Sequence, residues 1–115
     1  MPGPTWISVP EAADLLGIRD RDVRQLVRDG RLVTVRSSTG AAGIAREMLD
    51  LAAEPPAALD GLAGTLTLLG DGGMSPETVV DWLWERDDEL EETPIEALRS
   101  GRVHAVRRVA LAQAF

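Results

Sequence analysis

The fold of this chain is decided by two adjacent runs, SVPEAADLLGI (residues 8–18) and RDRDVRQLVRDG (residues 19–30). In the first run, Ser8 and Glu11 have the spacing of a capping box, in which each side chain accepts a hydrogen bond from the backbone amide of the other residue. This spacing predicts a helix that begins directly after Ser8. Pro10 fits the first turn, because the amide that proline lacks would have no intrahelical partner there. Apolar residues then recur at helical spacing, at Ala12, Leu15 and Leu16.

The second run predicts a second helix with an arginine-rich surface. Val23, Leu26 and Val27 share one face, which is typical of a helix that packs on a core. Gly17 separates the two helices and Gly30 ends the second, because glycine readily adopts the left-handed conformation that closes a helix. The remaining surface of the second helix carries Arg21, Arg24, Gln25 and Arg28.

A short β-hairpin is predicted after the second helix. Residues 32–35, LVTV, are rich in β-branched side chains and predict a strand. Residues 37–40, SSTG, predict a turn, and residues 43–45, GIA, the returning strand. Two short helices with a tight joint and a hairpin predict a winged helix-turn-helix, whose second helix enters the major groove of DNA. A short third helix is predicted over residues 46–53, ended by the proline pair that follows.

These residues resemble the N-terminal half-domain of the MerR and excisionase-type helix-turn-helix proteins. The match runs from Val9 to Gly30 and covers an apolar residue, the run Pro-Glu-Ala-Ala, a leucine pair, a glycine and an arginine-rich helix that ends in glycine. The resemblance implies DNA binding and says little about the target sequence.

Double-stranded DNA is therefore the partner that we predict. Arginine pairs with guanine and glutamine with adenine in the major groove, while arginine side chains and helix N-termini hold phosphates. Contacts with about four to six phosphates would give a log–log salt slope of about −4 to −5. The residues that we expect to contact DNA are Ser8, Arg19, Arg21, Arg24, Gln25, Arg28, Arg36 and Arg46.

The composition argues against an enzyme, a metal site and a cofactor site. The 115 residues include no cysteine and one histidine, His104, so disulfides, cysteine-based zinc sites and thiol chemistry are excluded. No constellation of side chains offers general acid–base catalysis, and no catalytic residue is predicted. All 12 basic residues are arginine, a bias typical of a GC-rich bacterial genome. The first residues lack the features of a signal peptide and no run approaches about 18 apolar residues, so we expect a cytoplasmic, nucleoid-associated protein without a membrane segment.

The charge is unevenly distributed along the chain. The formal net charge is −7. Residues 1–50 hold seven arginines and seven acidic residues, whereas residues 51–115 hold five arginines and twelve acidic residues. The first half is thus neutral overall, and its arginines can still meet phosphates.

The second half of the chain predicts a helical domain. Leucines at 59, 62, 66 and 69 recur at helical spacing, and a glycine-rich turn follows. Ser75-Pro76-Glu77 and Thr93-Pro94-Ile95-Glu96 carry helix-start signatures, and a last helix is predicted over residues 102–114. Between them, residues 87–92 predict a solvated acidic loop. The predicted fold is therefore mainly α with a small β-hairpin wing: a winged helix-turn-helix domain at residues 1–54 and a helical C-terminal domain at residues 58–115.

A second resemblance covers this half and extends over nearly the whole chain. The runs LTLLGDGG (66–73), VVDWL (79–83), PIEAL (94–98) and AVRR (105–108) resemble a family of small actinobacterial winged helix-turn-helix DNA-binding proteins. The resemblance implies regulation by a membrane-bound serine/threonine kinase, which phosphorylates a threonine in an acidic leader and thereby weakens DNA binding. Thr5 is the only threonine ahead of the first helix and has no such leader before it, so the phosphorylation site is not carried onto it.

Residues 94–109 also resemble the C-terminal domain of antitoxins that combine a helix-turn-helix with a toxin-binding helical domain. This resemblance supplies the alternative function, an antitoxin-like or adaptor protein whose acidic half, residues 58–115, binds a partner protein. The leading hypothesis is a transcriptional regulator. Since one small reader gives limited specificity, we expect it to form a homodimer through its C-terminal helices.

Overall fold

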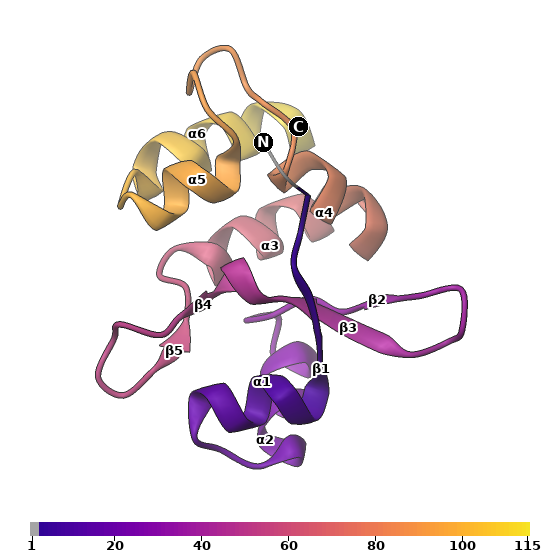
Figure 1. The fold of residues 1–115 in the computed structure, drawn as a ribbon. Coiled ribbons are helices and arrows are strands. Elements are labelled where there is room, and N and C mark those ends of the chain that lie inside the picture. The colour runs from indigo at the N-terminus through magenta and orange to yellow at the C-terminus, as the bar shows by residue number, and fades with distance from the viewer. Residues whose placement is uncertain (1–2) are drawn as a thin grey trace. The chain divides into compact units, whose positions relative to one another are not determined.

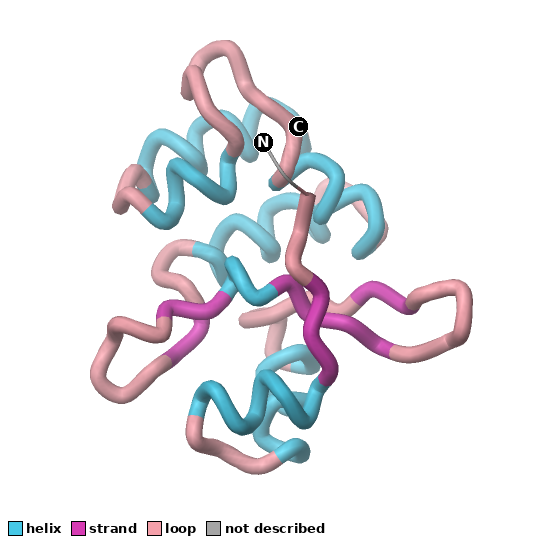
Figure 2. The backbone as a smooth tube through the Cα atoms, viewed as in Figure 1, coloured by secondary structure: helices cyan, strands magenta, loops and turns pink. Residues whose placement is uncertain are grey.

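The computed structural model describes residues 3–115, and the chain divides into two compact units, Met1–Leu59 and Asp60–Phe115. Helices account for much of both units, and the strands form two small antiparallel sheets (Figures 1 and 2). The predicted secondary-structure content, mainly α with a small β component, is confirmed. Among the described residues, no helix is long and apolar enough to cross a membrane.

The first unit builds a three-stranded sheet beside two short helices. The sheet has the order β1-β3-β2 with antiparallel neighbours, and β4 pairs with β5 in a separate two-stranded sheet. In chain order its elements are β1 (Trp6–Ser8), α1 (Val9–Leu16), α2 (Asp20–Arg28), β2 (Val35–Arg36), β3 (Ala42–Ala45), the 3₁₀ helix η1 (Arg46–Met48), β4 (Leu49–Asp50) and β5 (Ala57–Ala58).

The capping box predicted at the start of the first helix is confirmed. The Glu11 backbone amide donates to Ser8 Oγ at 3.2 Å, and the Ser8 amide donates to Glu11 Oε1 at 3.2 Å. Gly17 has a φ of 69° and closes α1, as predicted. The buried side of the two helices includes Ala12 and Val23, each 0% exposed, and Leu16, 4% exposed, so both helices pack on the core of the first unit.

The sheet differs from the sequence prediction in its strands. Trp6 and Ile7, which simply precede the first helix in the sequence, form a third strand, because β1 pairs with β3 and sets Ile7 opposite Ile44. The first hairpin strand lies at Val35–Arg36 rather than at residues 32–35. Leu32, the first residue of the predicted strand, is instead buried at 2% exposed, so the start of this run packs in the core.

The predicted third helix over residues 46–53 is wrong. Only the single turn η1 forms, and the chain then extends into β4. Asp50 ends the helical pattern, because its Oδ1 accepts the backbone amides of Ala52 and Ala53, both at 3.1 Å. This turn and the proline pair that follows it lead back into β5, which places residues 57–59 in the first unit.

The second unit consists of four helices. They are α3 (Leu62–Asp71), α4 (Pro76–Leu83), α5 (Pro94–Arg99) and α6 (Val103–Ala114). The helix starts predicted from sequence are confirmed, since Ser75 Oγ and Thr93 Oγ1 accept the backbone amides three residues ahead, at 3.3 and 3.2 Å. Both Trp82 and Trp84 are only partly exposed, and the Trp84 indole N–H is buried without a hydrogen-bond partner among the described residues.

Close contacts between α3 and α6 depend on glycine. A Cβ built on Gly61, the residue before α3, would lie 2.6 and 2.7 Å from the two γ carbons of Val103. At the other end, a Cβ on Gly72 would lie 2.7 Å from the Ala114 Cβ. The two helices therefore approach each other too closely for any side chain at either glycine.

The acidic segment from Asp87 to Glu92 is a folded turn rather than a free linker. Asp87 Oδ1 accepts the backbone amides of Glu89 and Leu90, and the Leu90 side chain is 1% exposed. Arg102 donates to the Leu90 carbonyl at 2.8 Å and to Glu92 at 2.6 Å, which attaches the turn to the start of α6.

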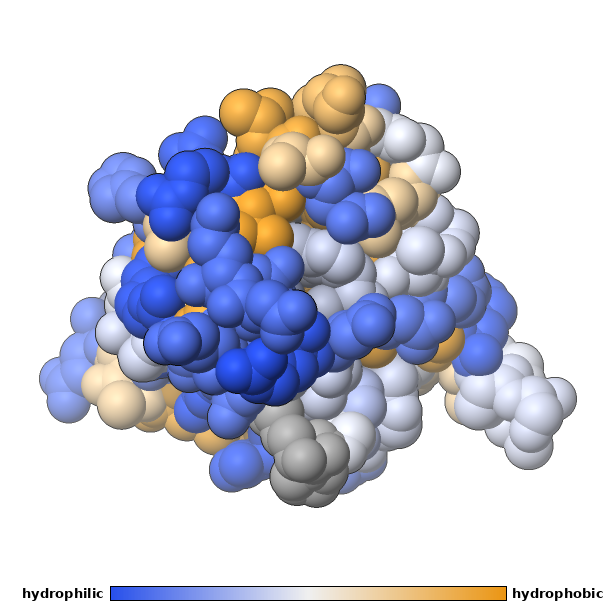
Figure 3. Space-filling model, turned by 90° about the horizontal axis from the view of Figure 1, so that it is seen from above, coloured by the Kyte–Doolittle hydropathy of each residue, from blue (hydrophilic) through white to orange (hydrophobic). Residues whose placement is uncertain are grey.

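Figure 3 shows hydrophilic residues over much of one face of the molecule, with a smaller hydrophobic group at its upper edge.

Candidate nucleic-acid interface

The first unit presents α2 with a buried and an exposed side. Val23 is buried, and Leu26 and Val27 are partly buried. Residues 17–19 form a tight joint to α1, in which the Ile18 amide donates to the Ala13 carbonyl at 3.1 Å. The joint and the buried side together fix which side of α2 faces solvent. That side carries the four predicted groove-facing residues, Arg21, Arg24, Gln25 and Arg28.

A hydrogen-bonded network connects three side chains at the end of α2. Arg28 donates to Gln25 Oε1 at 2.7 Å, and Gln25 Nε2 donates to Asp29 Oδ1 at 2.7 Å. The network orients the Gln25 amide and leaves one N–H and one oxygen lone pair for other partners. These are the two groups with which glutamine reads an adenine edge.

The start of α2 mixes both signs of charge. The Asp22 carboxylate accepts the Arg19 backbone amide at 3.1 Å, and Asp20 lies in the same first turn. Acidic side chains there stabilise the positive end of the helix dipole. Arg19, Arg21 and Arg24 are all exposed here, and Asp20 lies one turn before Arg24 on the same side of the helix.

The hairpin β2–β3 presents a single arginine near its turn. Arg36 donates to the Gly40 carbonyl at 2.7 Å, and the Ser37 amide donates to the Ala41 carbonyl at 2.9 Å. Residues 37–41 between the strands are all exposed. Arg36 thus lies on a short solvent-exposed projection, fixed by its own turn.

The other two predicted phosphate contacts lie elsewhere in the unit. Arg46 is exposed at the end of β3 that lies away from the turn, where its backbone amide donates to the Thr5 carbonyl at 2.8 Å. At the start of α1, the Ser8 hydroxyl and amide are both engaged by Glu11. The structure therefore brings together the α2 residues but separates Arg46 from the turn and places a carboxylate at Ser8.

One further exposed arginine lies near the end of α2 and is not among the predicted DNA contacts. Arg31 is exposed directly after Gly30 and lines a hollow of about 350 Å³ together with Leu26 and Asp22 of α2. Its position immediately after the helix-ending glycine was the available signal, because a residue there stays close to the last turn of the helix.

The described residues contain no group of three His, Asp or Glu side chains placed to hold a metal ion. His104 is exposed on α6. At Glu96, hydrogen bonds from the Thr93 backbone amide and hydroxyl lower the pKa from the ordinary value of 4.5. That carboxylate caps α5, so the shift reflects helix capping.

Comparison with known proteins identifies the relatives of this chain. Residues 59–114 match the family model described as the Rv2175c C-terminal domain of unknown function. The chain is 32% identical to a curated relative named DNA-binding protein Rv2175c, from Mycobacterium tuberculosis, over 97% of this chain and 82% of that protein. It is also similar to a solved structure, the NMR structure of Rv2175c, with a TM-score of 0.84 and 28% identity over 100% of this chain and 84% of that one. By the shared sequence and fold, the chain belongs to the Rv2175c family.

Proposed function

We propose that this chain is a double-stranded DNA-binding protein and a transcriptional regulator that acts in the cytoplasm. In this proposal α1 and α2 form the helix-turn-helix, β2–β3 is the wing, and α2 enters the major groove. The observation that carries it is the exposed side of α2, where three arginines and a glutamine lie opposite a buried side. The name of the relative, a DNA-binding protein, supports the same function.

The proposed base contacts come from α2. Arg24 and Arg28 are suited to pair with guanine, and Gln25, oriented by its network, is suited to read adenine. Arg21 lies one turn earlier on the same exposed side. The whole helix is only Asp20–Arg28, so it reads a short half-site.

The proposed phosphate contacts surround this helix. Arg36 of the hairpin and Arg19 at the start of α2 are exposed and positioned by local structure. Arg46 is a contact for a more distant phosphate, because it lies at the other end of β3. Ser8 contributes through the amide end of α1, which a phosphate can reach once the Glu11 carboxylate moves aside.

The second unit is the proposed site of self-association. A reader of one short helix gains specificity when two copies bind neighbouring half-sites. Leu111 of α6 and Phe115, which follows the helix, are 50% and 76% exposed, so the end of α6 offers apolar surface to a second copy. The same surface favours the alternative, an adaptor that binds a partner protein through residues 58–115.

Fluorescence anisotropy of a labelled duplex at two salt concentrations tests the proposed function. We expect wild-type binding to weaken with salt with a log–log slope of about −4 to −5. The double variant Arg24→Ala/Arg28→Ala should lose most of this binding. Arg86→Ala/Arg99→Ala, which removes two arginines from the second unit, is the charge-matched control and should lose far less binding than Arg24→Ala/Arg28→Ala.

Three results would count against the proposal: no wild-type binding at tens of micromolar, binding that is insensitive to salt, or equal loss in both double variants. In the first case the adaptor becomes the better explanation. Co-purification with the intact tagged chain, compared with its Leu111→Ser variant, would then identify a partner held by α6.

A further inference from the structure

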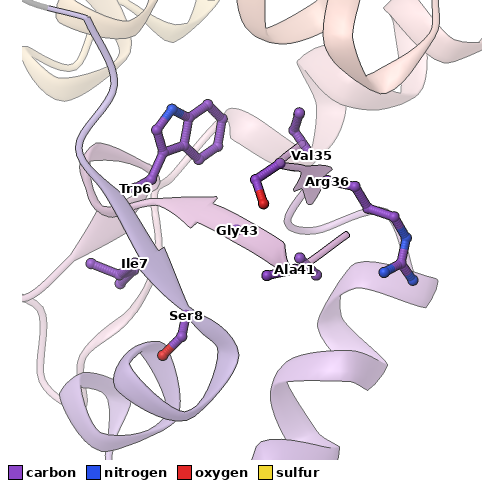
Figure 4. A pocket seen from close by; sticks show the side chains of 9 residues that line it. Trp6, Ile7, Ser8, Val35, Arg36, Ala41 and Gly43 are labelled. Carbon is purple, nitrogen blue, oxygen red and sulfur yellow. The ribbon is translucent and has the colours of Figure 1, made fainter. Parts of the chain in front are cut away.

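The sheet of the first unit carries a hollow whose lining includes two of the proposed phosphate contacts, Ser8 and Arg36. It has a volume of about 330 Å³ and lies on β1, β3 and β2. Figure 4 shows it from close by. The residues that shape it include Trp6, Val35, Ser37, Ala41, Ala42 and Gly43.

The strand register explains which side chains meet at the hollow. Residues directly opposite each other in an antiparallel sheet lie on the same face, and neighbours along a strand alternate between faces. The pairs Trp6↔Ala45 and Val35↔Gly43 therefore share one face, whereas Ile7 and Ile44 share the other. In Figure 4, Trp6 and Val35 lie on one side of β3, while Ile7 points away.

The base of the hollow exists because residue 43 is glycine. Its φ is not positive, so the backbone there would accept any L-residue. A Cβ at this position would lie 3.3 Å from Trp6 Cε3, so the indole ring passes closely over the bare strand. A glycine within a strand weakens the strand, and often marks a close approach by another group.

Trp6 is a second unfavourable feature at the same place. Its side chain is 46% exposed, although it lies next to an apolar depression of the same unit. A half-exposed indole beside a strand glycine leaves an aromatic wall open to solvent. The strand glycine and the half-exposed indole each lower the stability of the fold. Their occurrence at one site indicates that this surface serves a function.

The lining determines the kind of molecule that fits. Most of the wall is aliphatic or aromatic. The charged residue of the lining, Arg36, donates to the Gly40 carbonyl, and its guanidinium extends away from Trp6 in Figure 4. A charged group placed against the Trp6 ring would therefore lose hydration, while the Arg36 guanidinium is directed elsewhere. An indole wall favours an aromatic ring stacked on its face or directed edge-on to it.

We propose that this hollow is a binding site for an uncharged, planar aromatic small molecule, which lies against the Trp6 indole above Gly43. The volume is within the range of small-molecule sites, about 300–1,000 Å³. The Ser37 hydroxyl, now 2.7 Å from Thr39 Oγ1, is the polar group available to orient such a ligand.

The test uses the intact chain, without DNA, and indole as the probe. Two-dimensional ¹H–¹⁵N NMR spectra are recorded during the titration. We expect saturable shifts confined to the amides of β1, β2, β3 and residues 37–41 and to the Trp6 indole N–H, with a Kd on the order of 1 mM for so small a ligand. Because DNA is absent, the result does not depend on the proposed function.

Two variants and two controls make the test specific. Gly43→Val fills the base of the hollow and should weaken indole binding at least about tenfold, whereas Ala57→Val adds the same side chain in β5 and should not. Trp6→Leu removes the aromatic wall and gives a second test if Gly43→Val does not fold. Indole-2-carboxylate should bind at least about tenfold more weakly than indole.

Non-saturating shifts spread over both units would overturn the proposal. So would indole binding that neither Gly43→Val nor Trp6→Leu weakens. Equal affinity for indole-2-carboxylate would overturn the assignment to uncharged ligands.

Discussion

Glu96 makes the capping of α5 sensitive to pH. Its Oε1 accepts the Thr93 backbone amide at 3.0 Å and the Thr93 hydroxyl at 2.9 Å, and these bonds lower its pKa from the ordinary value of 4.5. A carboxyl whose pKa is lower in the folded than in the unfolded protein stabilises the fold fully at pH values above the unfolded pKa. That stabilisation is lost as the pH falls below 4.5 and through the folded pKa.

We therefore expect Glu96→Gln to flatten the acid side of the stability profile. Urea unfolding at pH values between about 7 and 3 measures this, with the free energy of unfolding of wild type falling more steeply than that of the variant. Glu77→Gln, which lies at the start of α4, is the matched control. Parallel profiles for Glu96→Gln and wild type would show that the cap does not titrate.

Individual residues could be predicted from the sequence where their role is local. The caps at Ser8, Ser75 and Thr93 follow from side chains that reach backbone amides three residues away, so the sequence contains both partners at a fixed spacing. The network of Gln25 could not be predicted in this way. It depends on which rotamers the exposed side chains of α2 adopt, and several are compatible with the helix.

At the scale of elements, the contact between α3 and α6 makes Gly61 irreplaceable. It has a φ of 81°, and an added Cβ would also meet both γ carbons of Val103. Gly101 has a similar φ, 86°, but has nothing within 4 Å of an added Cβ. A substitution at Gly101 therefore measures backbone strain alone, whereas a substitution at Gly61 measures backbone strain together with steric overlap.

Gly101→Ala should cost about 1–2 kcal/mol of stability, the price of a left-handed alanine. Gly61→Ala should cost a further 1–3 kcal/mol or so, because the α3–α6 contact is overpacked as well. Thermal and urea unfolding of the two variants measure the difference. Equal losses would mean that Val103 moves aside without cost.

The hairpin β2–β3 contributes a contact to phosphate in the proposed complex. Arg36→Ala should weaken DNA binding about equally for all sequences and reduce the log–log salt slope by about one. Anisotropy titrations at several salt concentrations check this, with Arg86→Ala as a control of equal charge. A change in sequence preference, with the slope unaltered, would instead assign Arg36 to a base.

The elements could be predicted from the sequence where a start and a stop signal enclose a periodic run. That was so for α1, between the Ser8 capping box and Gly17, while α2 had only a stop signal and α4 and α5 only start signals. Prediction failed at residues 46–53, where an apolar run suits a helix but pairing of Leu49 with Ala58 favours a strand. Pairing between distant residues also made a strand of Trp6–Ser8, and no local pattern shows such a partner.

The candidate DNA contacts on α2 followed from periodicity alone, whereas the hollow at Gly43 arises only when three strands meet.

For the molecule as a whole, net charge sets how strongly DNA is attracted at long range. Neutralising Asp81, Glu85 and Glu91, all exposed in the second unit, changes the net charge from −7 to −4. We expect DNA affinity to rise about two- to fivefold at low salt, with little change at high salt, where such repulsion is screened. The triple variant Asp81→Asn/Glu85→Gln/Glu91→Gln and the uncharged control Gln113→Ala are compared by anisotropy. A gain that persists at high salt would indicate a local contact.

The positions of the three tryptophans allow unfolding of the two units to be followed by intrinsic fluorescence. Trp6 is the tryptophan of the first unit and is half exposed, whereas Trp82 and Trp84 belong to the second unit and are more enclosed. Fluorescence from Trp6 should therefore be emitted at longer wavelength and be quenched more readily by acrylamide. The loss of structure in each unit can then be followed separately in one unlabelled sample, by colour and by quenching, and so can any order in which the two units unfold.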